Sequence, residues 1–323
     1  MRPIPAATQP IAAWWTATAL AAAILTSGCS VKTYAINMVG NALASGNSVY
    51  ESDDDIDLVG DALPFGLKLT ESLLAQSPHH AGLLLTACRG FVLYAYAFVD
   101  YPASLAGDED LDRARALRAR ARRLYLRGYQ FGIRAIERSY PDFGATLLVD
   151  PAGAARAMRP ADAARDVPLL YWTAAALGLA IAVSPDDAAL LARLPEVRAL
   201  LDRAIVLDET WGDGALHEFE VTLAGAVPGD PDVTLMTRHF ERAVELSKGR
   251  SAGAYLAYAE AVSVPRQNAA EFRRLIAQAL AVDADADPKN RLVNLLAHRR
   301  ARWLASRADE LFLDGDLSAA EGK

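Results

Sequence analysis

The hydrophobic pattern of the chain is helical from about residue 56 almost to its end. Apolar residues recur every three to four positions between turn signals, and Ala, Leu and Arg outnumber the β-branched residues typical of strands. Proline at a helix start, after or beside a residue that can cap it, recurs in Ser184-Pro185-Asp186-Asp187, Asp230-Pro231-Asp232 and Asp287-Pro288. The pattern predicts an all-α fold whose last long helix spans about 288–313.

The most apolar part of the folded chain is residues 83–99, and its period is ambiguous. Aromatic residues in "GFVLYAYAFVDY" (90–101) alternate as in a strand and also recur as in a helix. A strand of this length would be unusual and has no hairpin partner nearby, so a helix is favoured. Arg89 and the flanking residues argue against a membrane span. We expect a central buried helix with two faces, one carrying Phe91, Tyr94, Phe98 and Tyr101, the other Arg89, Leu93, Tyr96 and Asp100.

A loose repeat occurs four times, at spacings of about 34–39 residues or twice that. This is the period of tetratricopeptide-like hairpins. A small alanine at the equivalent place would let two helix axes approach closely. One hairpin cannot bury its apolar face alone, so neighbours would stack into an array of antiparallel helical hairpins with degenerate tetratricopeptide-like repeats. The alternative is that Ala-rich helices resemble one another through composition. The repeated segments are Arg134-Ala135-Ile136-Glu137, Arg203-Ala204-Ile205-Val206, Arg242-Ala243-Val244-Glu245 and Gln278-Ala279-Leu280-Ala281.

The N-terminal residues 1–28 read as a lipoprotein signal peptide. Residues 11–25 are apolar except for two threonines, which is too short to span a bilayer and suits a secretory signal. Leu25-Thr26-Ser27-Gly28-Cys29 resembles a lipobox, with Leu25 one place further from the cysteine than usual. We expect Cys29 to be the lipid attachment site, and Ser30 after it favours the outer membrane. The alternative is an ordinary signal peptide cut nearby.

The mature chain divides into a tether and one helical domain. Residues 29–55 are polar, contain Gly and Asn, and end in an acidic run, which predicts a tether. Residues 56–323 form the all-helical domain. Within it, the Pro/Gly-rich residues 141–168 are expected to cover or connect two halves of the array. Cys88 lies in an apolar run and is expected to be a buried, unpaired thiol.

Charge and motifs exclude several classes of function. With 33 Lys and Arg against 40 Asp and Glu, the chain has a net charge of −7, which disfavours nucleic acid as a partner. Phosphate loop, dinucleotide fingerprint and nucleophile elbow are all missing from the sequence. The segment His217-Glu218-Phe219-Glu220-Val221 begins like a zinc-protease helix, but Val221 stands where the second histidine is needed. The five histidines look scattered, so we expect no enzyme, metal or cofactor.

Two groups of side chains could form a binding site, one for an acidic partner and one for a small ligand. Residues 113–138 contain nine arginines, which form either a solvated helix face or a surface for an acidic partner. Buried Tyr and Trp residues would give a ligand cavity apolar walls with polar handles, and packing in the core is the alternative. The cavity candidates are Arg89, Phe91, Tyr94, Tyr96, Phe98, Tyr101, Tyr171, Trp172, Trp211, Tyr255 and Tyr258.

Six blocks of the sequence resemble one family. They are "DALPFGLKLTESLLAQSPHHAGLLL" (61–85), "GFVLYAYAFVD" (90–100), "LLYWTAAALGLAIAVSPDD" (169–187), "DRAIVLDETWGDGALHEFE" (202–220), "HFERAVELSKGRSAGAYLAYAEAVSVPRQN" (239–268) and "ALAVDADADPKNRLVNLLAHRRARWL" (279–304). Together they look like the T component associated with tripartite ATP-independent periplasmic (TRAP) transporters, often called TatT. The resemblance implies a non-enzymatic, lipid-anchored periplasmic protein of tetratricopeptide-like hairpins, assembled as a homotrimer. It also implies binding of the solute-binding P component and of a small hydrophobic or organic-acid ligand.

Two functions therefore remain open at this stage. One is a transport accessory that binds a solute-binding protein and holds a ligand in an aromatic-lined cavity. The other is a scaffold lipoprotein for envelope assembly, whose aromatic residues are core and whose hairpin groove holds a peptide segment.

Overall fold

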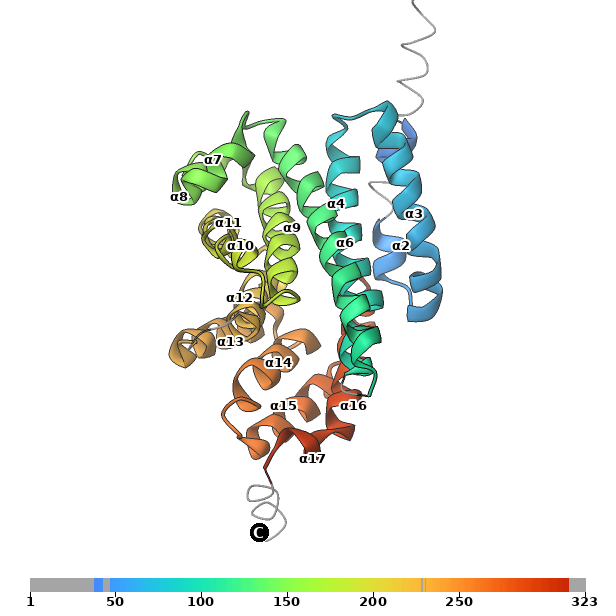
Figure 1. Ribbon diagram of the computed structural model, residues 1–323, viewed down its shortest axis with the longest axis vertical. Coiled ribbons are helices and arrows are strands. Elements are labelled where there is room, and N and C mark those ends of the chain that lie inside the picture. The colour runs from blue at the N-terminus through green and yellow to red at the C-terminus, as the bar shows by residue number, and fades with distance from the viewer. Residues whose placement is uncertain (1–37, 43–46, 108, 228, 230, 314–323) are drawn as a thin grey trace, which may run out of the picture.

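The computed structural model describes residues 38–42, 47–107, 109–227, 229 and 231–313 of the chain (Figure 1). These residues form helices and no strand, which confirms the all-α prediction. The predicted signal peptide and Cys29 lie outside the described residues, so lipid attachment stays a prediction.

The helices fall into two runs along the chain. The first run contains α2 (Asn47–Glu51), α3 (Ile56–Gln76), α4 (Ala81–Ala95), α5 (Tyr101–Ala106), α6 (Leu111–Glu137), α7 (Phe143–Val149), α8 (Pro151–Arg156) and α9 (Ala163–Ala182). The second contains α10 (Ala188–Leu191), α11 (Leu194–Asp208), α12 (Ala215–Ala226), α13 (Val233–Ser247), α14 (Ala252–Tyr258), α15 (Ala269–Ala281), α16 (Arg291–Ser306) and α17 (Ala308–Leu311).

Neighbours in sequence pack as neighbours in space. In the first run α3 packs on α4, α4 on α6, and α6 on α9. In the second run α12 packs on α13, α14 on α15, and α15 on α16, and the contact of α9 with α11 joins the two runs. The alanines of the proposed repeat, Ala135, Ala204, Ala243 and Ala279, are all buried between these helices. Small residues at such positions let helices approach closely, as at Gly132, where an added Cβ would lie 2.2 Å from Thr173 Oγ1. The equivalence of the repeats themselves stays a prediction.

The aromatic stretch is helical, as predicted, but not in one regular α-helix. It runs through α4, a π-helical turn at Tyr96–Asp100, and α5. Ala81–Ala106 is long and apolar enough to cross a bilayer, yet half of its most apolar window is buried against other helices. Cys88 in this stretch is fully buried, as expected, and burial raises the pKa of its thiol to about 12.

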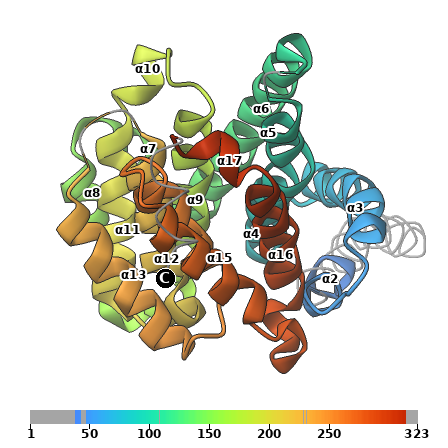
Figure 2. The ribbon, with the colours of Figure 1, turned by 90° about the horizontal axis from the view of Figure 1, so that it is seen from below.

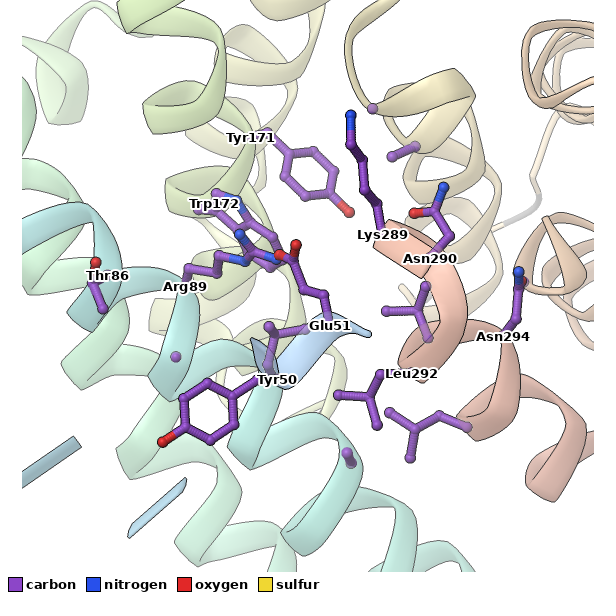
Figure 3. Close-up of a pocket in the computed structure, with 18 of the residues that line it drawn as sticks. Tyr50, Glu51, Thr86, Arg89, Tyr171, Trp172, Lys289, Asn290, Leu292 and Asn294 are labelled. Carbon is purple, nitrogen blue, oxygen red and sulfur yellow. The ribbon is translucent and has the colours of Figure 1, made fainter. Parts of the chain in front are cut away.

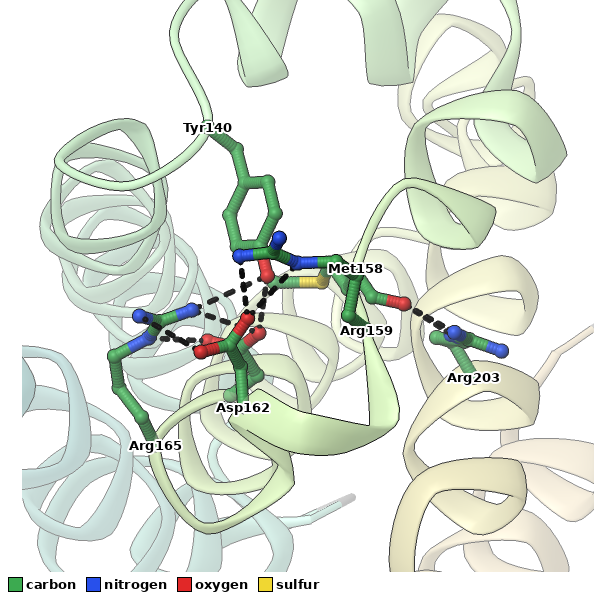
Figure 4. A network of polar contacts seen from close by, with 7 residues as sticks. Tyr140, Met158, Arg159, Asp162, Arg165 and Arg203 are labelled. Carbon is green, nitrogen blue, oxygen red and sulfur yellow. Dashed lines mark hydrogen bonds and ion pairs between the residues drawn. The ribbon is translucent and has the colours of Figure 1, made fainter.

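The Pro/Gly-rich segment 141–168 contains α7, α8 and the first turn of α9, and a polar network holds it in place (Figure 4). The Asp166 carboxylate is fully buried and accepts hydrogen bonds from Tyr140 Oη at 2.6 Å and Arg165 Nε at 2.7 Å. Arg203 of α11 donates from Nε to the Met158 carbonyl oxygen at 3.1 Å. The segment thus connects α6 to α9 and is bonded to α11.

The array closes on itself, so that its last long helix meets its first helices (Figure 2). Helix α16 packs against α2 and α3, where Ile56, Val59 and Leu292 form a small apolar cluster. Arg299 Nη1 on α16 donates to Asp57 Oδ1 on α3 at 2.8 Å. Stacked hairpins that curve into a closed ring leave a space along the inner helix faces.

Candidate functional site

The inner space contains a pocket of about 880 Å³, the size of a small-molecule site. Its walls come from residues far apart in sequence, on the segment 38–42 and on α2, α3, α4, α9, α12 and α16 (Figure 3). The turn before α12 also lines the pocket, and there Asp213 holds a positive φ of 52°, a strained conformation for a residue with a side chain.

An aromatic cluster forms one wall of the pocket. The Tyr171 ring centroid lies 4.9 Å from that of Trp172 on the same helix and 4.9 Å from that of Trp211 before α12. Phe98 lines the pocket beside α3, where its ring packs on Gly60. These rings present apolar faces together with the Tyr171 hydroxyl, so the wall suits an apolar body with a polar group.

Charged side chains also reach the pocket. Arg89 of α4 lies 5.3 Å above the Trp172 ring and forms an ion pair with Glu51 of α2. Burial lowers the pKa of the Arg89 guanidinium. On another wall, Glu218 of α12 accepts a hydrogen bond from Ser251 Oγ at 2.7 Å, and burial raises the pKa of this carboxyl.

Five of the cavity candidates named from the sequence meet at this pocket: Arg89, Phe98, Tyr171, Trp172 and Trp211. Five others lie outside it because they pack against neighbouring helices. Phe91 stacks on Phe131 at 5.8 Å, Tyr94 accepts a hydrogen bond from Arg120 and Tyr101 donates one to the Arg299 carbonyl oxygen. Tyr255 and Tyr258 are buried around Phe240.

Tyr96 lies outside the pocket lining, near the charged groups of Asp100, Glu260 and Arg300. It is 39% exposed, yet burial by the surrounding protein raises the pKa of its phenol to about 12. Nearby, Arg300 of α16 donates from Nε and Nη2 to the two oxygens of Glu260 at 2.6 and 2.9 Å. Glu260 and Asp100 both lie in π-helical turns, which are frequent at functional sites.

Sequence reasoning missed several pocket residues. Tyr50 and Glu51 lie in the segment interpreted as a tether, and Lys289 and Asn294 lie near the C-terminus. For Tyr50 and Glu51 the only sequence signal is the acidic run that begins at Glu51, and such a run also suits a solvated linker. Ring closure brings them to the pocket, and no local pattern in the sequence encodes that closure.

The expectation that the histidines are scattered is wrong for two of them. His217 Nδ1 lies 2.8 Å from His239 Nδ1, because α12 and α13 form a hairpin, and His217 Nε2 lies 3.1 Å from Glu209 Oε1. Burial lowers the pKa of both imidazoles, while the Glu209 carboxylate opposes the shift at His217. Among the residues that the structure describes, no cluster of His, Cys, Asp and Glu fits a metal ion.

Much of the arginine-rich face of α6 is engaged within the chain. Arg122 pairs with Asp187, Arg127 with Glu71, and Arg134 donates to the Pro78 carbonyl oxygen at 3.0 Å. These contacts fix α6 against its neighbours, while Arg113 remains exposed near its start.

Glu220, which follows Glu218 on α12, faces away from the pocket towards α11. Burial raises the pKa of its carboxyl to about 7, and the nearby Asp202 adds to the rise. The folded protein therefore binds a proton in the window between about 4.5 and 7 where the unfolded chain does not. Glu220 makes the fold less stable as the pH rises through that window.

The variant Glu220→Gln should be more stable than the wild type near pH 8, by about 2 kcal/mol, and equal to it near pH 4. Glutamine carries no charge, so the loss of stability with rising pH disappears. Urea unfolding across this pH range measures the difference, with the exposed Glu241→Gln on α13 as the control. Parallel pH profiles for wild type and Glu220→Gln would contradict the assignment.

The fold and its pocket define an all-helical protein of stacked hairpins, closed into a ring around an aromatic-walled, partly charged binding pocket. The family profile described as TRAP transporter T-component matches residues 52–312. The chain therefore belongs to the TRAP transporter T-component family.

One relative that aligns with nearly the whole chain is an uncharacterized protein of Treponema pallidum (strain Nichols). It is 30% identical over 312 residues, which cover 92% of this chain and 97% of the relative. Family membership supports the role of an accessory to a TRAP transporter, a family of transport proteins rather than enzymes. It implies association with transporter components and a periplasmic or membrane-associated location.

Proposed function

We propose that the protein is the membrane-anchored periplasmic accessory of a TRAP-type solute uptake system. In this proposal it binds the solute-binding P component and holds a small hydrophobic or organic-acid ligand in the pocket inside the ring. A lipid on Cys29 anchors it to a membrane, with the outer membrane favoured, and the chain assembles as a homotrimer.

The observation that carries the ligand part of this proposal is the pocket itself. A volume of about 880 Å³ lies within the usual range of small-molecule sites. Its wall of Tyr171, Trp172 and Trp211 combines apolar surface with a few polar groups, the composition expected of a site that fixes the orientation of an amphipathic ligand.

The partner part is tested by native mass spectrometry of the lipid-free protein mixed with its cognate solute-binding protein. We expect a complex at tens of micromolar, and the same spectra report whether the protein alone is a trimer. Absence of any complex at that concentration, in buffers of both low and moderate ionic strength, would remove the P component from the proposal.

The ligand part predicts that Trp172→Ala weakens binding of a neutral apolar dye, N-phenylnaphthylamine, by about tenfold. The dye is uncharged, so it reports the aromatic wall independently of any ion pair. Trp303→Ala is the matched control, because Trp303 is a half-buried ring that packs edge-to-face with Tyr101 outside the pocket. Fluorescence titration measures both variants, and equal losses in both would show that the dye does not bind in the pocket.

A further inference from the structure

Arg89 is a cation in a mainly apolar site. Its side chain is 25% exposed and its guanidinium lies over the Trp172 ring. A desolvated charge needs an opposite charge beside it, because an unpaired one would be strongly destabilising. A ligand that binds to Arg89 must therefore replace the acidic residue that pairs with it in the folded protein.

That residue is Glu51, the last residue of α2, whose carboxylate points across the pocket to Arg89 (Figure 3). Helix α2 has only five residues and packs against α16 and the turn Pro288–Asn290. Val49 on this helix is 66% exposed, and Tyr50 is half-buried against the small apolar cluster of α3 and α16. A helix this short is not stable on its own, which makes α2 an element that can leave the pocket at low cost.

We propose that Arg89 is the receptor for the carboxylate of the ligand, and that Glu51 occupies this receptor as an intramolecular stand-in until a ligand displaces it. The inference rests on the proposed function and narrows it to a carboxylate with an apolar body. The body would lie against Trp172, Tyr171 and Trp211, the rings next to the Arg89 guanidinium.

The exchange of one carboxylate for another keeps Arg89 paired throughout. Glu51 competes at an effective concentration in the millimolar range, since it is tethered to the same chain. A small acid without an apolar body would lose to it, and an acid that also covers the aromatic wall would win.

Calorimetric titration of octanoate and octanamide into the wild type, Glu51→Gln and Arg89→Met tests the proposal. We expect octanoate to bind Glu51→Gln at least tenfold more tightly than the wild type, because the competitor is gone. Octanamide should bind the wild type and Glu51→Gln within twofold of each other. Arg89→Met should bind acid and amide equally. Glu71→Gln is the matched control, since Glu71 pairs with Arg127 outside the pocket.

Hydrogen exchange supplies a second readout. Octanoate should increase exchange at the amides of α2 in the wild type, and the Glu51→Gln variant should show that increase without ligand. Equal binding of octanoate and octanamide by Glu51→Gln, an octanoate affinity in Glu51→Gln no higher than in the wild type, or no octanoate binding to Glu51→Gln at millimolar concentration would each overturn the proposal. If the neutral dye still binds in a Trp172-dependent way, such a result removes the Arg89 receptor and leaves the proposed function standing.

Discussion

Replacement of Arg165 by methionine should lower the free energy of unfolding by about 3–5 kcal/mol. The variant leaves the Asp166 carboxylate, which is only 1% exposed, with Tyr140 as its remaining side-chain donor. Asp166→Asn should cost less, about 1–2 kcal/mol, because the Arg165 side chain is 46% exposed and can turn to water or to Asp162. Replacing Arg165, the more exposed partner, should thus lower the free energy of unfolding more than replacing the buried Asp166.

Chemical unfolding of the single variants and of the double variant measures this asymmetry. The double variant should be close to Asp166→Asn alone, since no buried charge remains to be compensated. Arg159→Met is the control, because Arg159 is 74% exposed and pairs with Asp162 at 3.0 Å in the same network. Equal costs for Arg165→Met and Asp166→Asn would mean that the buried carboxylate does not depend on its arginine.

The helical nature of the chain could be predicted from the sequence, but the helix starts could be predicted only in part. Asp287 caps the turn before α16, as expected from Asp287-Pro288. Near Ser184-Pro185, however, the cap is Asp187, whose Oδ1 accepts from two amides, and the expected long last helix is divided into α16 and α17. Where several acceptors stand close together, tertiary packing selects the cap, and the local pattern does not.

The aromatic stretch shows a similar limit. Regular helical spacing puts Phe91 and Phe98 on one face, yet Phe91 is buried against Phe131 while Phe98 lines the pocket. The π-helical turn at Tyr96–Asp100 inserts extra chain into the helix and changes which side chains share a face. No composition signal marks such a turn, so the register beyond it could not be predicted.

The candidate site was predictable where it lies on long helices. Arg89, Tyr171 and Trp172 stand out in apolar segments as polar or amphipathic side chains that need partners. Glu51 meets Arg89 on a short helix, α2, that packs against α16 where the ring closes, and that closure sums small rotations over every hairpin. A sequence read one segment at a time gives no measure of that sum.

The second large effect is expected at the ion pair between Arg300 and Glu260. Arg300→Met should lower the free energy of unfolding by about 3 kcal/mol, while Glu260→Gln should cost about 1–2 kcal/mol. Without Arg300, the Glu260 carboxylate, which is 29% exposed, loses its bidentate partner, and the half-buried Asp100 loses a nearby cation. Without Glu260, the guanidinium keeps the Tyr101 and Trp303 rings at 5.6 and 5.9 Å.

Because Arg300 lies on α16 and Glu260 in the π-helical turn after α14, their pair also ties the closing helix to the ring. Hydrogen exchange in α16 should therefore rise in Arg300→Met by more than in Arg302→Met, an exposed arginine two residues along the same helix. Unfolding in urea gives the stability difference for the same pair of variants. If both arginine variants behave alike, the Arg300–Glu260 pair does not hold α16 in place, and the apolar contacts of α16 with α3 keep the ring closed.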